Sequence, residues 1–265
     1  MATQKKVLRV FSYLPNPRVW KALIAAEFCN VEVETLGAAP AELAHWLWDF
    51  DARELNDSEM TEQNPNARTG RRGFSARLYK TDAFLVAHPF GTVPAAFDPT
   101  GNVGIFESNS ILRAVARSGD SDHGLYGTDA YSASRIDSFL DAGLVFARES
   151  QEYMLAMNNP SIALYDRMQA AFEFYLAGIN NALTHFPYIA GDSLSIADIG
   201  YACDLAQFLR ERTMADALHQ IKRAPISAAA ESAYPKALQH LTALMKRTEF
   251  AKYLTPLTPQ PTETN

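Results

Sequence analysis

The sequence predicts an N-terminal α+β domain with a βαβ unit followed by a ββα unit, and then a C-terminal domain made only of helices. Three observations predict this architecture: apolar runs flank a helical segment near the start, a hairpin pattern follows over residues 93–106, and no convincing strand pattern appears later. We therefore expect an α+β domain over residues 1–118, an all-α domain over residues 119–255 and a disordered tail over residues 256–265.

The first βαβ unit follows from the order of its patterns. The apolar run over residues 7–11 predicts a strand. From Arg18 onward apolar residues recur at helical spacing, with Asn16 as the expected N-cap and Pro17 at the first helical position. The alternating run over residues 31–35 predicts a second strand, and a strand, a helix and a strand within about thirty residues indicate a parallel unit.

Residues 38–82 are the least regular part of the chain. Helical spacing of apolar residues over residues 41–50 predicts a helix. An acidic stretch over residues 49–62 and a basic stretch over residues 68–80 follow, with little periodicity. We interpret the segment as a functional or mobile loop, and we expect the two stretches to pair with each other rather than to bind an anionic partner.

The remaining patterns complete the two domains. Strands over residues 93–97 and 103–106 flank a turn and predict a hairpin, and Ser108 is expected to cap the next helix. Turn residues over residues 118–124 mark the best linker. Four helices are predicted beyond it, over residues 133–157, 162–185, 195–213 and 234–246. Ser195 and Asp198 form a capping box, which is folding chemistry rather than catalysis.

The composition narrows the classes of function. Hydrophobic residues make up 48% of the 265 residues and charged residues 20%, which argues against global disorder. The net charge of −6 lacks the basic footprint that nucleic acid or anionic lipid usually needs, and no apolar run approaches the ~18 residues of a membrane span. Cys29 and Cys203 make neither a disulfide framework nor a zinc site by themselves. We expect a cytoplasmic protein with no metal, no nucleic acid partner and no membrane anchor.

Four local patterns in register resemble the glutathione transferase superfamily. They are the strand–turn–helix of residues 10–26, the loop HPFGTVP of residues 88–94, the segment FESNSIL of residues 106–112 and the capping motif GDSLSIADI of residues 191–199. Residues 12–26 and 106–109 are most similar to the transferase domain of the gamma subunit of elongation factor 1B. The resemblance covers residues 7–36 and 84–255. It implies a thioredoxin-like N-terminal domain with an insertion at about residues 38–82, and an all-helical C-terminal domain.

The resemblance implies a glutathione site in the N-terminal domain. In the family the bond Val93-Pro94 is cis, and the backbone of Val93 pairs with the cysteinyl part of glutathione like a short added strand. Glu107 and Ser108 would bind the γ-glutamyl end, the carboxylate at the helix N-terminus and the ammonium on Glu107. The alternatives are an ordinary turn proline and an ordinary capped helix.

The glycyl end of glutathione has several candidate partners. His88 occupies the position of an asparagine in the family's loop motif and would contact this end, although a solvated loop histidine is the alternative. Lys80 and Arg77 are further candidates for the glycyl carboxylate. Arg18 would face the glutathione carboxylates or solvent.

The group that faces the glutathione sulfur stays open. In the family a Tyr, Ser or Cys near the start of the first helix donates to the thiolate and lowers a thiol pKa that is ~8.5 in free form. Here Asn16, Ser12 and Tyr13 are the candidates, and Asn16 is also a plain N-cap. No cysteine lies in this turn, which disfavours exchange through an enzyme thiol.

The resemblance leads to a cytoplasmic, homodimeric glutathione transferase. Glutathione would be the cosubstrate, and a small hydrophobic electrophile would lie against Phe139, Phe146 and Tyr153 of one helix. A non-catalytic binding module like the gamma subunit is the first alternative, ranked second because no charged linker or further domain follows in this sequence. A glutathione-dependent lyase or etherase, its cleft remodelled by residues 38–82, is the other.

Overall fold

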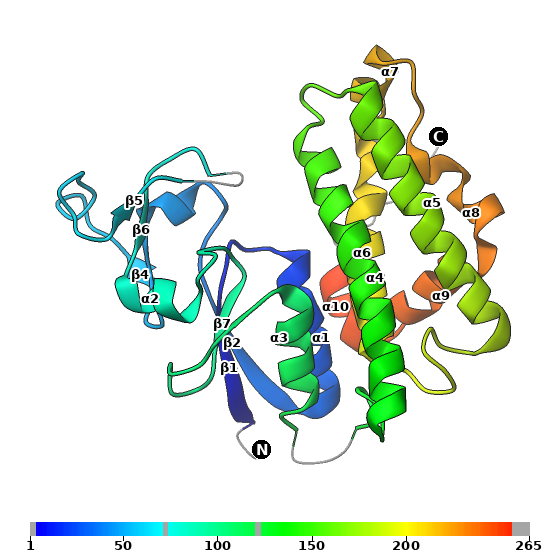
Figure 1. Ribbon diagram of the computed structural model, residues 1–265, viewed down its shortest axis with the longest axis horizontal. Coiled ribbons are helices and arrows are strands. Elements are labelled where there is room, and N and C mark those ends of the chain that lie inside the picture. Colours follow the sequence, from blue (N-terminus) through cyan, green and yellow to red (C-terminus); the bar gives the residue numbers. More distant parts are fainter. Residues whose placement is uncertain (1–3, 71–73, 120–122, 256–265) are drawn as a thin grey trace. The chain divides into compact units, whose positions relative to one another are not determined.

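The computed structural model describes residues 4–70, 74–119 and 123–255. It divides into two compact units, Met1–Ser121 and Asp122–Asn265 (Figure 1). The first unit is α+β and the described residues of the second are helical, which confirms the predicted fold class. The predicted tail lies outside the described residues, as do residues 71–73 of the basic stretch and 120–122 of the predicted linker.

The first unit is built on a four-stranded sheet with the order β2–β1–β7–β8. Strand β1 (Lys5–Phe11) pairs in parallel with β2 (Val31–Leu36), and α1 (Pro17–Cys29) connects them, which confirms the βαβ unit. On its other side β1 pairs antiparallel with β7 (Ala95–Phe97), whose hairpin partner is β8 (Gly104–Phe106). The predicted hairpin is therefore also confirmed.

Helix α3 (Ser108–Ala116) follows the hairpin and contacts α1. Apolar side chains that include Val19 and Ile111 are buried in these two helices. The Nζ of Lys21, a buried residue of α1, donates to the Oδ1 of Asn109 in α3 over 3.0 Å. The start of α3 is thus fixed against α1 by both apolar packing and a buried hydrogen bond.

The insertion after β2 forms a second four-stranded sheet, with the order β4–β3–β6–β5. Its elements are η1 (Glu42–His45), β3 (Trp46–Trp48), β4 (Arg53–Glu54), β5 (Ala67–Arg68) and β6 (Leu78–Lys80), followed by α2 (Asp82–Ala87). Figure 1 shows β4, β5 and β6 gathered beside α2. The helix predicted over residues 41–50 is wrong, because η1 and β3 divide this stretch, and the insertion is a small sheet rather than a loop. Its functional role stays a prediction.

The reason for this difference is a core that the insertion shares with the first sheet. We call it the shared core, and its buried members are Phe11, Leu43, Trp48, Ala52, Leu78, Phe84, Ala95 and Phe97. Trp48 lies edge-on to Phe11 at 5.4 Å and to Phe84 at 5.8 Å, so burial across the sheet outweighs the helical spacing.

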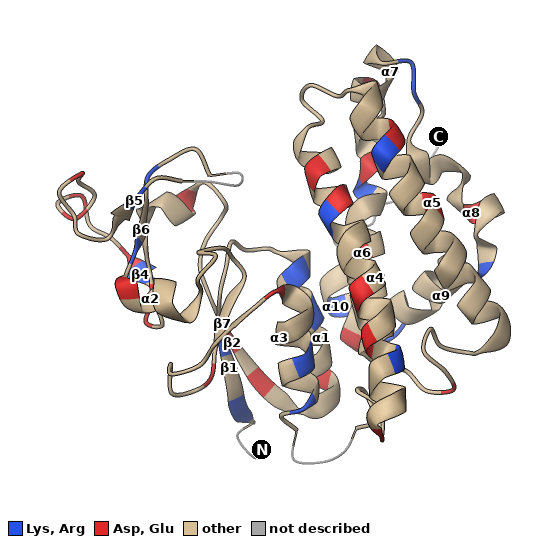
Figure 2. Cartoon of the chain, in the orientation of Figure 1, with Lys and Arg blue, Asp and Glu red and all other residues tan. Residues whose placement is uncertain are grey.

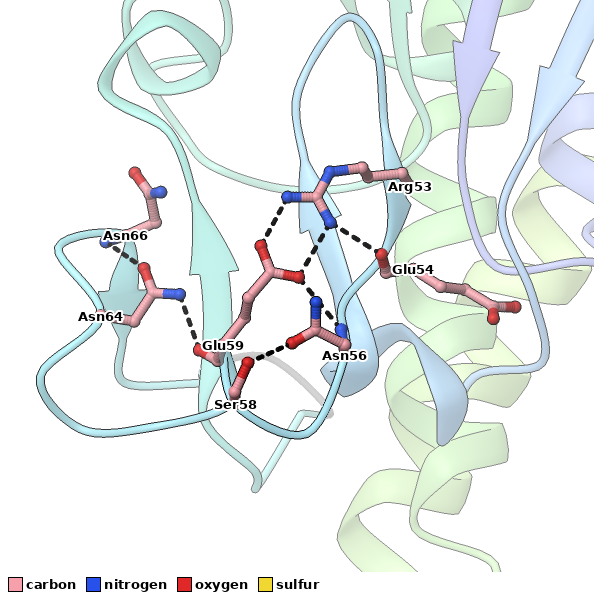
Figure 3. Close-up of polar contacts among 7 residues, drawn as sticks. All are labelled: Arg53, Glu54, Asn56, Ser58, Glu59, Asn64 and Asn66. Atoms are coloured by element: carbon pink, nitrogen blue, oxygen red, sulfur yellow. Dashed lines mark hydrogen bonds and ion pairs between the residues drawn. The ribbon is translucent and has the colours of Figure 1, made fainter.

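A network of hydrogen bonds orders the loop between β4 and β5 (Figure 3). Glu59 accepts from the two terminal nitrogens of Arg53 at 2.6 and 3.0 Å and from the N–H of Asn56 at 3.1 Å. These bonds, the one from Arg53 first, lower the pKa of Glu59 to about 2. The acidic and basic stretches also meet directly in the ion pair of Glu62 with Arg77, as predicted.

The second unit is a set of helices throughout its described residues. They are α4 (Ala130–Leu155), α5 (Ile162–His185), α6 (Ile196–Phe208), η2 (Leu209–Met214), α7 (Ala215–Gln220), η3 (Ile226–Ala229), α8 (Ala230–Ala233), α9 (Pro235–Met245) and α10 (Thr248–Leu254). The helix predicted over residues 195–213 is divided between α6 and η2. Among the helices described, none combines the length and the apolar character that crossing a bilayer requires.

The capping box at the start of α6 is confirmed and is fully buried. Asp198 accepts from the N–H of Ser195 at 2.9 Å, from its hydroxyl at 3.1 Å and from the N–H of Ile189 at 3.0 Å. The Nε2 of His240 in α9 lies 2.8 Å from the Oδ1 of Asp198. The carboxylate thus joins the start of α6 to α9 and has a structural role.

Candidate functional site

The turn after β1 is held against the end of β2. The N–H of Ser12 donates to the carbonyl of Leu36 at 3.0 Å, and the N–H of Leu14 donates to the carbonyl of Ala38 at 2.8 Å. Between these partners Gly37 has a φ of 136°, and a Cβ there would lie 1.8 Å from the oxygen of Ser12. Only glycine fits this close approach, so the backbone of the turn has a fixed position.

Asn16 caps α1 and is fully occupied by the turn itself. Its Oδ1 accepts from the N–H of Arg18 and its Nδ2 donates to the Oγ of Ser12, both at 2.9 Å. Neither Asn16 nor Ser12 has exposed surface. The predicted N-cap is confirmed, and neither side chain presents a surface to a ligand.

Tyr13 is the member of this turn with both a donor and accessible surface. It is half-buried and packs against the shared core. Burial raises the pKa of its phenol, and the nearby Arg18 opposes this in part. The phenol is therefore protonated at neutral pH and available as a hydrogen-bond donor.

The loop before β7 carries Val93 at its end. The bond between Val93 and Pro94 is cis, as the resemblance implies. Val93 is half-buried against the shared core, and among the described residues neither its N–H nor its carbonyl has a backbone partner. The Nζ of Lys80 donates to the carbonyl of Gly91 at 2.7 Å and lies 4.4 Å from the ring centre of Trp48. Lys80 thus ties this loop to the insertion.

Glu107 precedes α3 in an unusual backbone conformation. Its φ of 65° and ψ of 125° place a non-glycine residue in a region that costs about 1–3 kcal/mol and that clusters at functional sites. Its carbonyl accepts from the N–H groups of Ser110 and Ile111, while its carboxylate is exposed and caps nothing. The cap position belongs to Glu107, so the prediction that Ser108 caps the helix is wrong. Ser108 is buried at the first helical position.

His88 lies inside the first unit rather than in solvent. Its side chain is 1% exposed, and its ring lies 4.7 Å from Phe97 and 5.0 Å from Phe84. Neither ring nitrogen makes a hydrogen bond within the described chain, although the backbone of Ala96 is near. Burial lowers the pKa of His88 to about 4. The solvated alternative is wrong, and the ring presents no accessible surface to a glycyl carboxylate.

Two of the three aromatic residues predicted to line an electrophile pocket lie in the core of the second unit. Phe146 and Tyr153 are each 1% exposed. Phe146 stacks on Tyr175 at 4.8 Å, and the hydroxyl of Tyr153 donates to the buried carboxylate of Glu211 at 2.6 Å. Both are therefore core residues. Phe139 is half-buried, with the guanidinium of Arg135 at 5.3 Å from its ring centre.

The comparisons with known proteins agree with the fold. Residues 162–243 match the family model described as the C-terminal domain of glutathione S-transferase. The chain belongs to the glutathione S-transferase superfamily. A transferase of Methylobacillus flagellatus, solved with glutathione bound, has the same fold at a TM-score of 0.62 and 16% identity, over 93% of this chain and 98% of that one.

Curated relatives of this superfamily member include translation factors and transferase-like proteins. Elongation factor 1-gamma 1 of rice is 30% identical over 72% of this chain and 38% of its own length. A glutathione S-transferase-like protein of a Fusarium species is 26% identical over 74% of this chain and 75% of its own length. The chain thus spans well under half of the rice factor.

Sequence reasoning missed the residues with which the insertion packs against the first sheet and the loop before β7. Trp46 and Phe74 pack against the same core as Tyr13 and Val93, and Lys80 holds the loop before Val93. The aromatic content of the insertion was visible, but helical spacing concealed the alternation of a strand. Within the described ranges no group of three or more His, Cys, Asp or Glu side chains gathers to hold a metal.

Proposed function

We propose that the first unit binds glutathione and stabilises its thiolate for attack on a small apolar electrophile, the activity of a glutathione transferase. The observation that carries this proposal is the strained residue Glu107 at the start of α3. Its φ is 65°, and its exposed carboxylate makes no cap hydrogen bond with the helix, so this carboxylate is available to a charged group of a ligand.

The start of α3 suits the γ-glutamyl end of glutathione. The α-carboxylate would accept from the N–H and hydroxyl of Ser108, where the helix supplies a partial positive charge. The carboxylate of Glu107 would accept from the neighbouring ammonium group. Both charges of one amino acid would thus be paired by two adjacent residues, and Arg18 would face the glutathione carboxylates.

The backbone of Val93 suits the cysteinyl part. Its N–H and carbonyl would pair with the same groups of the cysteinyl residue, as in the addition of a short strand. This pairing would extend the ligand along the loop before β7, in which Pro94 is buried. Specificity for a peptide-like ligand follows from two backbone hydrogen bonds with fixed spacing.

Tyr13 is the donor that we assign to the sulfur. Its phenol keeps its proton at neutral pH, so it would donate to a thiolate and lower the thiol pKa from ~8.5. Asn16 and Ser12 would act through Tyr13, because their side chains hold the turn and are buried. The rate would come from thiolate stabilisation and from the proximity of the electrophile.

Calorimetric titration with glutathione tests the site. We expect the wild-type protein to bind and the variant Glu107→Gln to bind about tenfold more weakly, because it loses a charge-assisted hydrogen bond. Glu54→Gln, which neutralises an exposed acid of the insertion, is the matched control and should bind like the wild type. Absence of binding heat in the wild type, or equal affinity of Glu107→Gln, would contradict the proposal.

A non-catalytic binding module is the second candidate. The identity of 30% to elongation factor 1-gamma favours it. Turnover of 1-chloro-2,4-dinitrobenzene with glutathione separates the two: an enzyme turns over, whereas a module binds glutathione without turnover. A glutathione-dependent lyase or etherase, a homodimer and a cytoplasmic location stay predictions from the resemblance.

A further inference from the structure

Residues 46–50 of the insertion run alongside β1 in the direction opposite to that of the strand. The ring of Trp46 lies 6.0 Å from Phe11, the last residue of β1. Four residues later, Phe50 lies under the guanidinium of Arg9 at 4.3 Å and against Phe97 at 5.5 Å. The chain from Trp46 to Phe50 therefore runs from the site end of β1 back toward its start.

Alternation in β3 separates a core tryptophan from an accessible one. Trp46 and Trp48 lie on the same side of the strand because they are two residues apart. Trp48 is buried, and its indole N–H donates to the carbonyl of Leu43 at 3.0 Å. Trp46 is only half-buried, and so is Phe74, which lies edge-on to Trp48 at 5.6 Å.

These two rings pack against the same core as two residues of the candidate site. The partly buried hydrophobic neighbours of the shared core include Tyr13, Val93, Trp46 and Phe74. Trp46 also lies against Phe11, two residues before Tyr13 in the chain. Two of the four are the residues assigned to the cysteinyl part and to the sulfur of glutathione. The other two are large apolar surfaces from the insertion.

The position of Trp46 is fixed before any ligand arrives. Strand β3 is paired on both sides, with Trp46 opposite Glu54 of β4 and Leu47 opposite Tyr79 of β6. The loop after β4 is ordered by the double hydrogen bond of Arg53 with Glu59 (Figure 3). A rigid aromatic surface binds apolar groups without a large ordering cost.

We propose that Trp46 and Phe74 form the apolar wall against which the substituent on the glutathione sulfur lies, so that the insertion determines specificity for the electrophile. This inference rests on the proposed function, because it places the sulfur beside Tyr13. It replaces Phe146 and Tyr153 with residues of the first unit. The chemistry of the wall, two aromatic rings without a charged group, selects flat or aliphatic apolar electrophiles.

Calorimetry with two ligands tests this inference. Glutathione and S-hexylglutathione share every polar group, so the ratio of their affinities measures contact with the hexyl chain. We expect the wild type to prefer S-hexylglutathione, and Trp46→Ala to reduce this preference about tenfold, with a smaller reduction in Phe74→Ala. Phe50→Ala removes a half-buried ring from the far end of the same segment and should keep the preference.

The outcomes separate the wall from the proposed function. An unchanged preference in Trp46→Ala, or no preference in the wild type while glutathione still binds, overturns the wall alone. If glutathione does not bind to the wild type, both proposals fall. If Trp46→Ala does not fold, quenching of tryptophan fluorescence by acrylamide is compared between Trp46→Phe and the wild type, with and without S-hexylglutathione. S-hexylglutathione should shield the fluorescence of the wild type and not that of the variant, and equal shielding overturns the wall.

Discussion

The side-chain amide of Asn16 donates to the hydroxyl oxygen of Ser12 over 2.9 Å, and neither residue has exposed surface. The same asparagine accepts from the N–H of Arg18 as the N-cap of α1. Two of the three side chains that the sequence offers to a bound thiol are therefore committed to the turn. The third, Tyr13, keeps a phenol at the rim of the shared core.

The first prediction concerns Tyr13→Phe. Removing the phenol should raise the pKa of the bound glutathione thiol by about one unit, because one hydrogen bond to the charged form is lost. The ultraviolet absorbance of the thiolate, followed against pH in the complex, measures this pKa. Tyr131→Phe alters a highly exposed tyrosine of α4 and is the control. A thiol pKa equal in the wild type and in Tyr13→Phe would remove Tyr13 from the proposed mechanism.

The second prediction concerns His88 and pH. Its pKa of about 4 in the folded chain lies below the ~6.5 of an unfolded chain, so the unfolded state binds the proton first as pH falls. Above pH ~6.5 the ring is neutral in both states and does not change the free energy of unfolding. Between pH ~6.5 and ~4 the free energy of unfolding falls, by up to about 3 kcal/mol.

Denaturant unfolding of the wild type and of His88→Leu at a series of pH values measures this loss. Leucine has no proton to gain, so the wild type should lose stability relative to the variant as pH falls to about 4. The carboxylates titrate in both proteins and cancel in the difference. A difference in unfolding free energy that stays constant with pH would show that His88 is not the cause.

Helix spacing and capping residues were sufficient to predict much of this fold. The bounds of α5 equal the predicted ones, and the box of Ser195 with Asp198 forms as its spacing indicates. These features depend on neighbours within a few residues. The β-hairpin before α3 was predictable for the same reason, because its turn residues and its alternation are local.

The insertion and the burial of the site residues were not predictable by the same means. Trp46 and Trp48 lie in a strand because Phe11 and Phe84, distant in sequence, offer a common core. A histidine in a loop is usually exposed to solvent, yet the rings of Phe84 and Phe97 lie against His88. In both places tertiary contacts override the local pattern.

The third prediction concerns Asp198→Ala. The carboxylate accepts from Ile189 and twice from Ser195, so its removal leaves buried donors without an acceptor. We expect the free energy of unfolding of the variant to fall by about 3 kcal/mol or more. Asp129→Ala, at the exposed capping box of α4, should cost only about 1 kcal/mol. Equal losses in the two variants would contradict the structural role of burial at Asp198.

The last prediction concerns Lys80, which could affect glutathione binding either by holding the Val93 loop or by pairing with the glycyl carboxylate. Lys80 is 9% exposed, and its ammonium group lies over Trp48 and donates to the carbonyl of Gly91, two residues before Val93. Lys80→Met should therefore weaken glutathione binding by displacing the Val93 loop. It should weaken the binding of γ-glutamylcysteine, which lacks the glycyl residue, by the same factor. If Lys80 instead paired with the glycyl carboxylate, calorimetry would show a loss for glutathione and none for γ-glutamylcysteine.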